Sequence, residues 1–225
     1  MSDTTVVHLL RHGKVHNPAN ILYGRLPGYR LAASGRAMAQ GVADHLRGTD
    51  IGYLAASSLQ RAQETARPLA ELTGLPIVTD ERIIEAANDF EGTAVGLNTF
   101  GRPATWLMLR DPLRPSWGEP YLQIAHRMLA AVYTAVQAAD GRAAVLVTHQ
   151  LPIVSVRRYL EGRRLWHDPR RRQCAVASLT SLTFVDGVFA GVTYAEPVGH
   201  IAAVDDLAGD PDVEQLVPPV DGSTP

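Results

Sequence analysis

Short apolar runs alternate along the chain with stretches in which apolar residues recur every three or four positions. The run from Val6 to Leu10 predicts a buried strand. In residues 34–46 the apolar side chains recur at i, i+4 and i+8, which predicts a helix with Ser34 as its N-cap and Gly48 beyond its end. The same pattern predicts strands at 51–55, from 76 onward and at 143–147, and helices at 59–73 (capped by Ser57 or Ser58), 121–139 and 152–160.

Three segments break this alternation. Residues 176–185 and 189–194 read as strands and flank Asp186-Gly187, a pair typical of a two-residue hairpin turn. Residues 93–120 are rich in loop-forming residues, with one short helix expected near 106–109, and are predicted to insert over the active site. Residues 201–225 are acidic and contain prolines, which predicts a loosely packed tail after a domain formed by residues 1–200.

This order of elements defines the expected fold class. Strands that alternate with helices form a mostly parallel sheet with helices on both faces, so we expect an α/β protein with a three-layer α/β/α sandwich. The predicted hairpin adds an antiparallel edge to that sheet. Such sheets bind their ligands beyond the carboxyl ends of the parallel strands, and a functional site is expected there.

The composition is that of an ordinary globular protein. Lys plus Arg number 21 and Asp plus Glu number 23, for a net charge of −2, so neither nucleic acid nor a membrane surface is an expected partner. The single cysteine, Cys174, cannot form an internal disulfide, and the apolar run near the N-terminus is too short for a signal peptide. We therefore expect a cytoplasmic protein that binds an anion, if it binds one, through a local cluster of basic residues.

Basic, nucleophilic and acidic side chains follow the predicted strands where those strands end. Because parallel strands end at one edge of a sheet, these side chains are expected to converge. A neutral imidazole can attack phosphorus, arginine can bind two phosphate oxygens at once, and a carboxylic acid can protonate a leaving oxygen. In strand order, the residues are Arg11, His12 and Gly13; Ser57, Ser58 and Arg61; Glu85; and Thr148 and His149.

Two other clusters of functional side chains suggest different interpretations. His8, His12 and His16 recur every four residues, but a strand followed by Gly13 gives them no common helical face, so no metal site is predicted. Arginines 163, 164 and 170–172 could reach an anionic substrate, although a solvated surface is the favoured interpretation.

Four ordered blocks resemble the motifs of the histidine phosphatase superfamily, which includes the cofactor-dependent phosphoglycerate mutases. The resemblance extends over roughly residues 5–185 and leaves the tail outside. Where the family commonly has a hydroxyl residue and a glycine, this chain has Val15 and Gln150. The blocks are Leu10-Arg11-His12-Gly13 with Asn17 and 24–36 after it, 57–66, 82–85 with 90–92 after it, and Val147-Thr148-His149.

The resemblance implies a role for each matching residue. His12 would be the nucleophile that becomes phosphorylated, and Glu85 would donate the proton to the leaving group. No metal ion or organic cofactor is implied. The phosphate pocket would be formed by Arg11, Arg61 and His149, with Asn17, Gly24 and Arg25 as further substrate contacts.

The expected activity is that of a metal-independent phosphomonoesterase acting on a small phosphorylated substrate. A first alternative is a mutase, which would return the phosphoryl group to an acceptor instead of water. A second is a binding module for phosphorylated ligands without catalysis. The sequence leaves the substrate and the oligomeric state open, with a homodimer among the alternatives.

Overall fold

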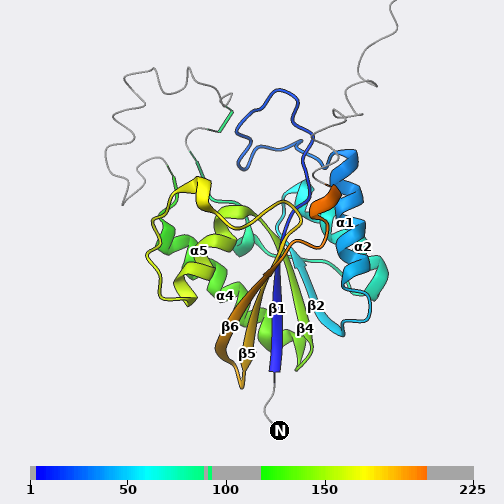
Figure 1. The fold of residues 1–225 in the computed structure, drawn as a ribbon, viewed down its shortest axis with the longest axis vertical. Coiled ribbons are helices and arrows are strands. Elements are labelled where there is room, and N and C mark those ends of the chain that lie inside the picture. Colours follow the sequence, from blue (N-terminus) through cyan, green and yellow to red (C-terminus); the bar gives the residue numbers. More distant parts are fainter. Residues whose placement is uncertain (1–3, 89–90, 93–117, 202–225) are drawn as a thin grey trace, which may run out of the picture.

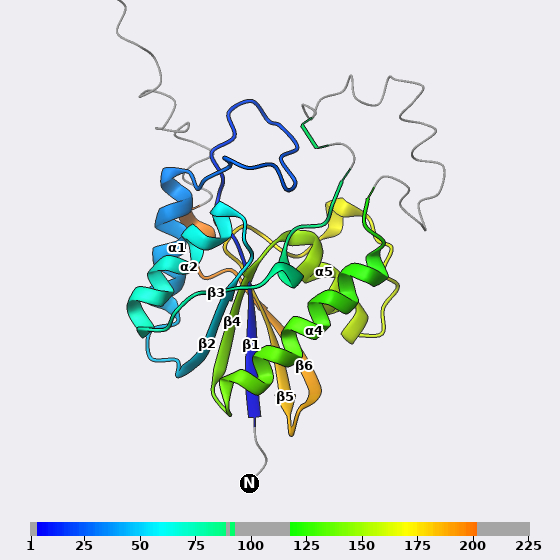
Figure 2. The ribbon, with the colours of Figure 1, turned by 180° about the vertical axis from the view of Figure 1, so that it is seen from behind.

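The computed structural model describes residues 4–88, 91–92 and 118–201, and within them one sheet is covered by helices on both faces (Figures 1 and 2). None of the helices in these ranges is long and apolar enough to cross a membrane. The strands are β1 (Thr4–Arg11), β2 (Ile51–Ala56), β3 (Val78–Thr79), β4 (Ala143–Thr148), β5 (Leu179–Val185) and β6 (Val188–Ala195). The helices are α1 (Ala33–His45), α2 (Gln60–Thr73), α4 (Tyr121–Ala139) and α5 (Gln150–Leu160), with short 3₁₀ turns η1 (Glu81–Ile83) and η3 (Pro169–Arg171).

The sheet has the strand order β3-β2-β4-β1-β5-β6. β1, β2, β3 and β4 run parallel, and the β5–β6 hairpin lies antiparallel along β1. The hairpin turns at Asp186 and Gly187, whose φ angles of 50° and 76° both lie in the left-handed region that a two-residue turn requires. The predicted three-layer α/β sandwich with an antiparallel edge is confirmed.

The two helical layers bury opposite faces of the sheet. Side chains of α1 and α2 pack with Leu10 and Val147 in one core, and side chains of α4 and α5 pack with Val7 and Leu9 in the other. Residues of β1 therefore point alternately into two cores, which is why the strand reads as one apolar run. Because β1, β2 and β4 are parallel neighbours, the loops that follow them all begin at the same edge of the sheet.

Several predicted boundaries need correction. α1 and α2 begin after Ala32 and Leu59, and neither has a side-chain cap, so the predicted caps at Ser34 and at Ser57 or Ser58 are wrong. Ser57 instead uses its hydroxyl in a buried hydrogen bond to another strand end. The predicted end of this helix at residue 73 is correct, and Gly74 follows it in the left-handed conformation that glycine adopts readily.

Two strands begin later than predicted. β3 comprises only Val78 and Thr79, because a proline at position 76 has no N–H to give to the ladder. β5 starts at Leu179, since residues 175–178 form a tight turn in which Ala177 has a φ of 54°. That turn lies against the loop that follows β1, because Ala177 N donates a 3.2 Å hydrogen bond to His12 O.

Other expectations lie outside the described residues. The short helix near 106–109 and all but the last part of the predicted insertion fall within 93–117, and the tail falls almost entirely within 202–225. The division into a domain of residues 1–200, an insertion and a tail stays a prediction.

Candidate active site

The carboxyl ends of β1, β2 and β4 bring three loops together. His12 N donates a 3.0 Å hydrogen bond to Thr148 O, and Ser57 N donates one of 3.0 Å to Val147 O. These bonds continue the sheet pairing one residue beyond the strands. The side chains that leave the sheet at this edge are thus fixed relative to one another by the backbone.

His12 is 2% exposed and lines a pocket at this edge. Its Nδ1 lies 2.8 Å from Gly13 O, and because a carbonyl oxygen only accepts, Nδ1 carries the proton. The neutral ring therefore has its lone pair on Nε2. Burial, and then the charges of Arg61 and Arg11, hold the pKa of His12 well below its ordinary value, which favours this neutral, nucleophilic form.

His149 lies beside His12, with ring centroids 5.1 Å apart. Its Nε2 is 2.6 Å from the hydroxyl of the buried Ser57, while its buried Nδ1 has no hydrogen-bond partner among the described residues. Burial, and then the proximity of His12, keep the pKa of His149 well below its ordinary value. A neutral ring that accepts from Ser57 would leave the Nδ1–H available to a bound oxygen.

Arg61 is completely buried without a carboxylate partner among the described residues. Its Nη2 donates to Gly24 O at 2.7 Å, its guanidinium carbon lies 4.8 Å from the centre of the Tyr23 ring, and Nε and Nη1 are left without partners. Arg11 donates from Nη1 to Cys174 O at 2.6 Å and also has a buried, unpartnered Nε. The buried Arg61 and the partly buried Arg11 thus both carry buried N–H donors without a partner, which a bound anion would satisfy.

Thr65 connects the loop after β1 to Arg61. Its hydroxyl donates to Arg61 O at 2.7 Å and accepts from Gly13 N at 3.1 Å. The buried face of α2 thereby fixes the turn that follows His12. Arg61 and His12 are consequently held by one continuous set of backbone and side-chain bonds.

Glu85 lies in the pocket wall, after β3 and η1. Its Oε1 accepts a 2.8 Å hydrogen bond from Ala86 N. Burial raises the pKa of Glu85 above its ordinary value, although the bond from Ala86 and the charges of Arg61 and Arg11 act in the opposite direction. A raised pKa keeps a carboxyl group protonated to higher pH, as a proton donor requires.

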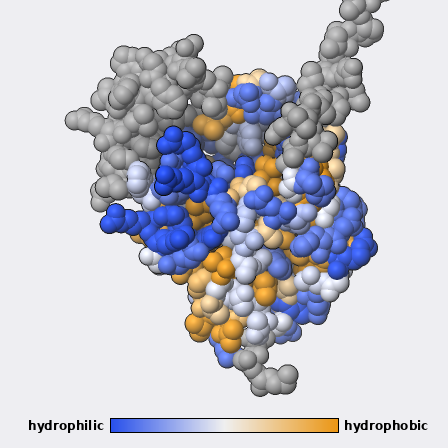
Figure 3. Space-filling model, viewed as in Figure 1, coloured by the Kyte–Doolittle hydropathy of each residue, from blue (hydrophilic) through white to orange (hydrophobic). Residues whose placement is uncertain are grey.

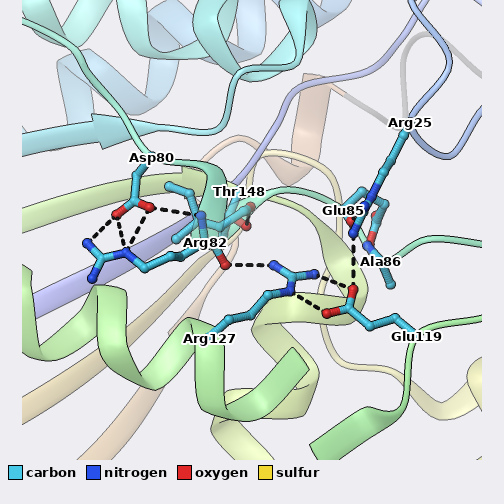
Figure 4. Close-up of polar contacts among 9 residues, drawn as sticks. Arg25, Asp80, Arg82, Glu85, Ala86, Glu119, Arg127 and Thr148 are labelled. Atoms are coloured by element: carbon cyan, nitrogen blue, oxygen red, sulfur yellow. Dashed lines mark hydrogen bonds and ion pairs between the residues drawn. The ribbon is translucent and has the colours of Figure 1, made fainter. Parts of the chain in front are cut away.

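A chain of ion pairs and hydrogen bonds supports the segment that carries Glu85 (Figure 4). Arg25 donates to Glu85 O at 2.7 Å and pairs with Glu119 at 3.1 Å. Arg127, on α4, pairs with Glu119 at 2.8 Å and donates to Arg82 O at 2.6 Å. The Thr148 hydroxyl, at the end of β4, donates to a further carbonyl of the segment, that of residue 83. The segment is therefore tied to both α4 and the central sheet.

The pocket has a volume of about 270 Å³. Its walls bring the sequence-predicted Arg11, His12, Gly24 and Glu85 together, and the fully buried Arg61 and His149 adjoin them. The remaining lining comes from the loops after β1, η1 and η3, from the segment leading to α4 and from the start of α5. These lining residues are 21–23, 86–88, 118, 119, 121, 150, 151 and 172.

Asn17 and Arg25, which were also expected to contact substrate, neither line the pocket nor leave their side chains unused. Asn17 uses its side chain to bond Ile21 O at 2.9 Å and Ile21 N at 3.0 Å, and so closes its own loop. Arg25 is directed to Glu85 O and Glu119, as described above. Their assignment as substrate contacts stays a prediction that this arrangement does not favour.

Arg172 is one of the pocket residues that the sequence interpretation did not assign to the site, and the one among them with a cationic side chain. Its arginine-rich surroundings favoured a solvated surface, but Arg172 is partly buried and lines the pocket, while its neighbour Arg171 is exposed. The alternation of exposed and inward-facing residues after η3 follows from tertiary packing, which the sequence does not signal. Among the described residues, no group of three or more His, Cys, Asp or Glu side chains could hold a metal ion.

The fold and the site together define an α/β protein with a pocket at the carboxyl ends of its parallel strands, lined by arginine side chains and by the buried His12. The chain belongs to the histidine phosphatase superfamily (branch 1), whose family model matches residues 7–197.

Individual proteins and solved structures are similar to this chain. The Mycobacterium tuberculosis protein Rv0525 is 52% identical over 199 residues, which are 88% of this chain and 98% of that protein. A probable phosphoglycerate mutase, GpmB of Yersinia enterocolitica, is 28% identical over 65% of this chain and 70% of its own length. The native structure of the mycobacterial glucosyl-3-phosphoglycerate phosphatase Rv2419c is similar with a TM-score of 0.66 at 26% identity, covering 87% of this chain and 97% of that one.

Proposed function

We propose that the protein is a metal-independent phosphomonoesterase that acts through a phosphohistidine at His12. The observation that carries the proposal is the 2.8 Å bond from His12 Nδ1 to Gly13 O, which leaves the lone pair on Nε2 in the wall of an arginine-containing pocket. The substrate is a small phosphorylated molecule, in keeping with a pocket of about 270 Å³.

In the first step, the Nε2 lone pair of His12 forms a bond to phosphorus as the bond from phosphorus to the ester oxygen breaks. The unused donors of Arg11 and Arg61, with the His149 Nδ1–H, would bind the non-bridging oxygens and stabilise their charge. Glu85 would transfer its proton to the departing oxygen, which leaves as an alcohol.

In the second step, water attacks the phosphorus atom of the phosphohistidine. The Glu85 carboxylate would take a proton from that water, the bond from phosphorus to Nε2 would break, and neutral His12 would be restored with inorganic phosphate as the product. The raised pKa of Glu85 suits a group that must release and regain a proton near neutral pH.

The test is turnover of a panel of phosphomonoesters in EDTA, combined with acid-quench labelling. We expect the wild type to release phosphate and to carry an acid-labile, base-stable phosphoryl group that is absent from His12→Ala. A strict requirement for Mg²⁺ or Zn²⁺, or unchanged turnover by His12→Ala, would contradict the proposal. Folding of the variant is checked by circular dichroism.

A mutase is the second candidate, because one relative is a probable phosphoglycerate mutase. A mutase would return the phosphoryl group from His12 to a hydroxyl group of the bound molecule. Analysis of the same reactions for isomerised ester as well as free phosphate distinguishes the two activities. Binding of phosphorylated ligands without any turnover would identify a non-catalytic module instead.

A further inference from the structure

Arg61 is a completely buried cation that few polar groups of the protein contact. It lies in the first turn of α2. Within the described part of the chain its side chain makes one hydrogen bond, from Nη2 to Gly24 O at 2.7 Å, and leaves Nε and Nη1 without partners. Its guanidinium carbon lies over the ring of Tyr23, 4.8 Å from the ring centre. Two consecutive residues of the loop after β1, Tyr23 and Gly24, therefore contact this cation.

An aromatic ring holds a cation differently from a carboxylate. The negative face of the ring attracts the guanidinium, and the attraction strengthens where water is excluded. Unlike a carboxylate, the ring carries no charge to neutralise the arginine and takes up no N–H donor in a conventional hydrogen bond. By contrast, Glu119 pairs with both Arg25 and Arg127 and occupies donors of each. The contact with Tyr23 thus leaves the charge and two donor nitrogens of Arg61 to a ligand.

Tyr23 is itself held in place. Its ring stacks on that of Tyr29, with centroids 4.9 Å apart and an angle of 28° between the ring planes. Next to it, Leu22 O accepts a 2.9 Å hydrogen bond from Gly92 N, which connects this loop to a later segment of the chain. In Figure 1 the loop lies at the top of the molecule, beyond the strand ends, and Figure 3 shows both hydrophobic and hydrophilic residues on its surface. The Tyr23 ring thus has a fixed position beside Arg61.

The ring and the hydroxyl of Tyr23 have different surroundings. Tyr23 is half-buried and lines the pocket, and its hydroxyl makes no hydrogen bond to any residue that the structure describes. The ring is the part that contacts Arg61. Phenylalanine at this position would keep the ring, whereas leucine would remove it and keep an apolar side chain. The two substitutions therefore separate an effect through Arg61 from a direct contact of the hydroxyl with substrate.

We propose that Tyr23, supported by Tyr29, is a positioning residue for Arg61: its ring orients the guanidinium and shields it from water, so that Nε and Nη1 stay available to the phosphoryl group. The proposal rests on the proposed function, in which Arg61 binds the non-bridging oxygens. Without the ring, the guanidinium would keep its bond to Gly24 O but could adopt other orientations. Water would then compete with the phosphoryl group for its donors, and a preorganised charge would be lost from the site.

The kinetic test compares Tyr23→Leu with Tyr23→Phe on p-nitrophenyl phosphate. We expect Tyr23→Leu to lower kcat/KM about tenfold, which corresponds to about 1.4 kcal/mol, and Tyr23→Phe to retain most of the wild-type value. Tyr29→Leu should give a smaller loss, because Tyr29 lies outside the pocket and acts only by supporting the Tyr23 ring. Tyr133→Leu is the matched control, since Tyr133 contacts the ring of Phe184 and does not line the pocket. Circular dichroism checks that each variant is folded.

A double-mutant cycle with Arg61→Met tests whether Tyr23 acts through Arg61. In the Arg61→Met background, Tyr23→Leu should cause almost no further loss of kcat/KM. Equal losses in the two backgrounds would show that Tyr23 acts independently of Arg61 and would overturn the proposal. Equal losses in Tyr23→Leu and Tyr23→Phe, which would assign the effect to the hydroxyl, or no loss in Tyr23→Leu, would overturn it as well.

NMR separates the positioning role from the phosphatase function, because it needs no turnover. The Nε–H resonance of Arg61, assigned by its absence from Arg61→Met, should exchange with water slowly in the wild type and in Tyr23→Phe. In Tyr23→Leu the exchange should be about tenfold faster or more. This result without hydrolysis of any ester would support the positioning role and contradict the phosphatase function. Equal exchange rates in the wild type and Tyr23→Leu would exclude the positioning role whatever the activity.

Discussion

The guanidinium of Arg25 donates a 2.7 Å hydrogen bond to the backbone carbonyl of Glu85, although the two residues are 60 positions apart in sequence. The same guanidinium pairs with Glu119, which pairs with Arg127 of α4 (Figure 4). The backbone of the expected proton donor is thus fixed by ion pairs that connect the loop after β1 to α4. This arrangement places Arg25 as a positioning residue for Glu85.

Replacement of Arg25 by methionine should disturb Glu85 without removing any group from the pocket lining. We expect the phosphorylation rate of an alkyl phosphate to fall about tenfold, the cost of one lost charge-assisted bond, and that of p-nitrophenyl phosphate to fall much less. Single-turnover phosphorylation rates on the two esters measure the difference. An equal fall on both esters would indicate a general structural role or a direct phosphate contact.

The contribution of Glu85 to the phosphorylation rate should increase with the basicity of the leaving group. Glu85→Gln should slow phosphorylation by alkyl esters by roughly 10²–10⁴-fold and largely spare the nitrophenyl ester, whose phenolate needs no proton. Steady-state rates would report hydrolysis of the phosphohistidine if that step were the slower one. Single-turnover rates of phosphorylation are therefore compared. Glu81→Gln serves as a control four residues upstream. A larger selective loss of the phosphorylation rate with alkyl esters in that variant would identify Glu81 as the proton donor instead.

The pH dependence of these reactions follows from the direction of the Glu85 shift. A raised pKa means that the acid is present at low pH and is lost as the pH rises through that raised value. The wild-type phosphorylation rate with alkyl esters should therefore decline on the alkaline side, and that decline should be absent with the nitrophenyl ester. Persistence of the same alkaline decline in Glu85→Gln would assign it to another group.

Arg61 should show opposite effects on activity and stability. Arg61→Met is expected to lower kcat/KM more than 100-fold, because a charged donor in a closed site is worth about 3 kcal/mol. Its burial is compensated by one hydrogen bond and one aromatic ring among the described residues, so the free energy of unfolding should be unchanged or higher by up to about 2 kcal/mol.

Urea denaturation and thermal unfolding with and without inorganic phosphate test the stability part of this prediction. Phosphate should raise the Tm of the wild type but not of Arg61→Met. Arg82→Met is the contrast, since it would leave the largely buried carboxylate of Asp80 without its charged partner, with only the backbone N–H of residue 82 still donating to it, and should destabilise the protein. A destabilisation of Arg61→Met as large as that of Arg82→Met would show that Arg61 is structural.

The neutral state of the buried histidines should also appear in the pH dependence of stability. The folded-state pKa of His12 and that of His149 lie well below the unfolded value of 6.5, mainly through burial. Below pH 6.5 the unfolded chain therefore binds more protons than the folded chain, and stability falls as the pH falls. The slope contributed by each histidine is at most about 1.4 kcal/mol per pH unit.

Urea denaturation between pH 7 and pH 5 measures this slope. His12→Asn should show a shallower fall than the wild type, and His126→Asn controls for the loss of an exposed histidine. A slope that is identical in the wild type and His12→Asn would contradict a depressed pKa for His12. Titration of the His12 ring by NMR gives an independent check.

The sequence predicted the sheet and much of the site because both depend on local patterns. β1 and β4 read as apolar runs and are followed directly by His12 and His149, while Arg61 lies in the first turn of α2, after β2. The orientation of long side chains escaped prediction. Arg25 and Arg172 are both arginines in irregular segments, and only the packing of those segments directs one away from the pocket and the other toward it. The serine caps were predicted wrongly because Ser57 uses its hydroxyl in a buried hydrogen bond with His149, and because α1 begins at Ala33, one residue before Ser34.

Two backbone segments cross closely at Gly13 and Gly35, which leaves no room for a side chain at either position. A Cβ atom at Gly13 would lie 2.5 Å from Gly35 O, and one at Gly35 would overlap the carbonyl oxygen of Lys14. Because both obstacles are backbone atoms, side-chain rotation cannot relieve them. Gly35→Ala should thus push the first turn of α1 away from the loop that holds His12, with a loss of about 1–3 kcal/mol in the free energy of unfolding.

The same displacement should reduce the activity of the folded fraction, since the loop fixes the Gly13 carbonyl that orients the His12 ring. Gly191→Ala is the matched control, because Gly191 lies in β6 with no atom within 4 Å of an added Cβ. Urea denaturation and the single-turnover phosphorylation rate are measured for both variants. We expect Gly191→Ala to match the wild type in both, whereas a Gly35→Ala variant with wild-type stability and rate would show that the crossing can relax without moving the nucleophile.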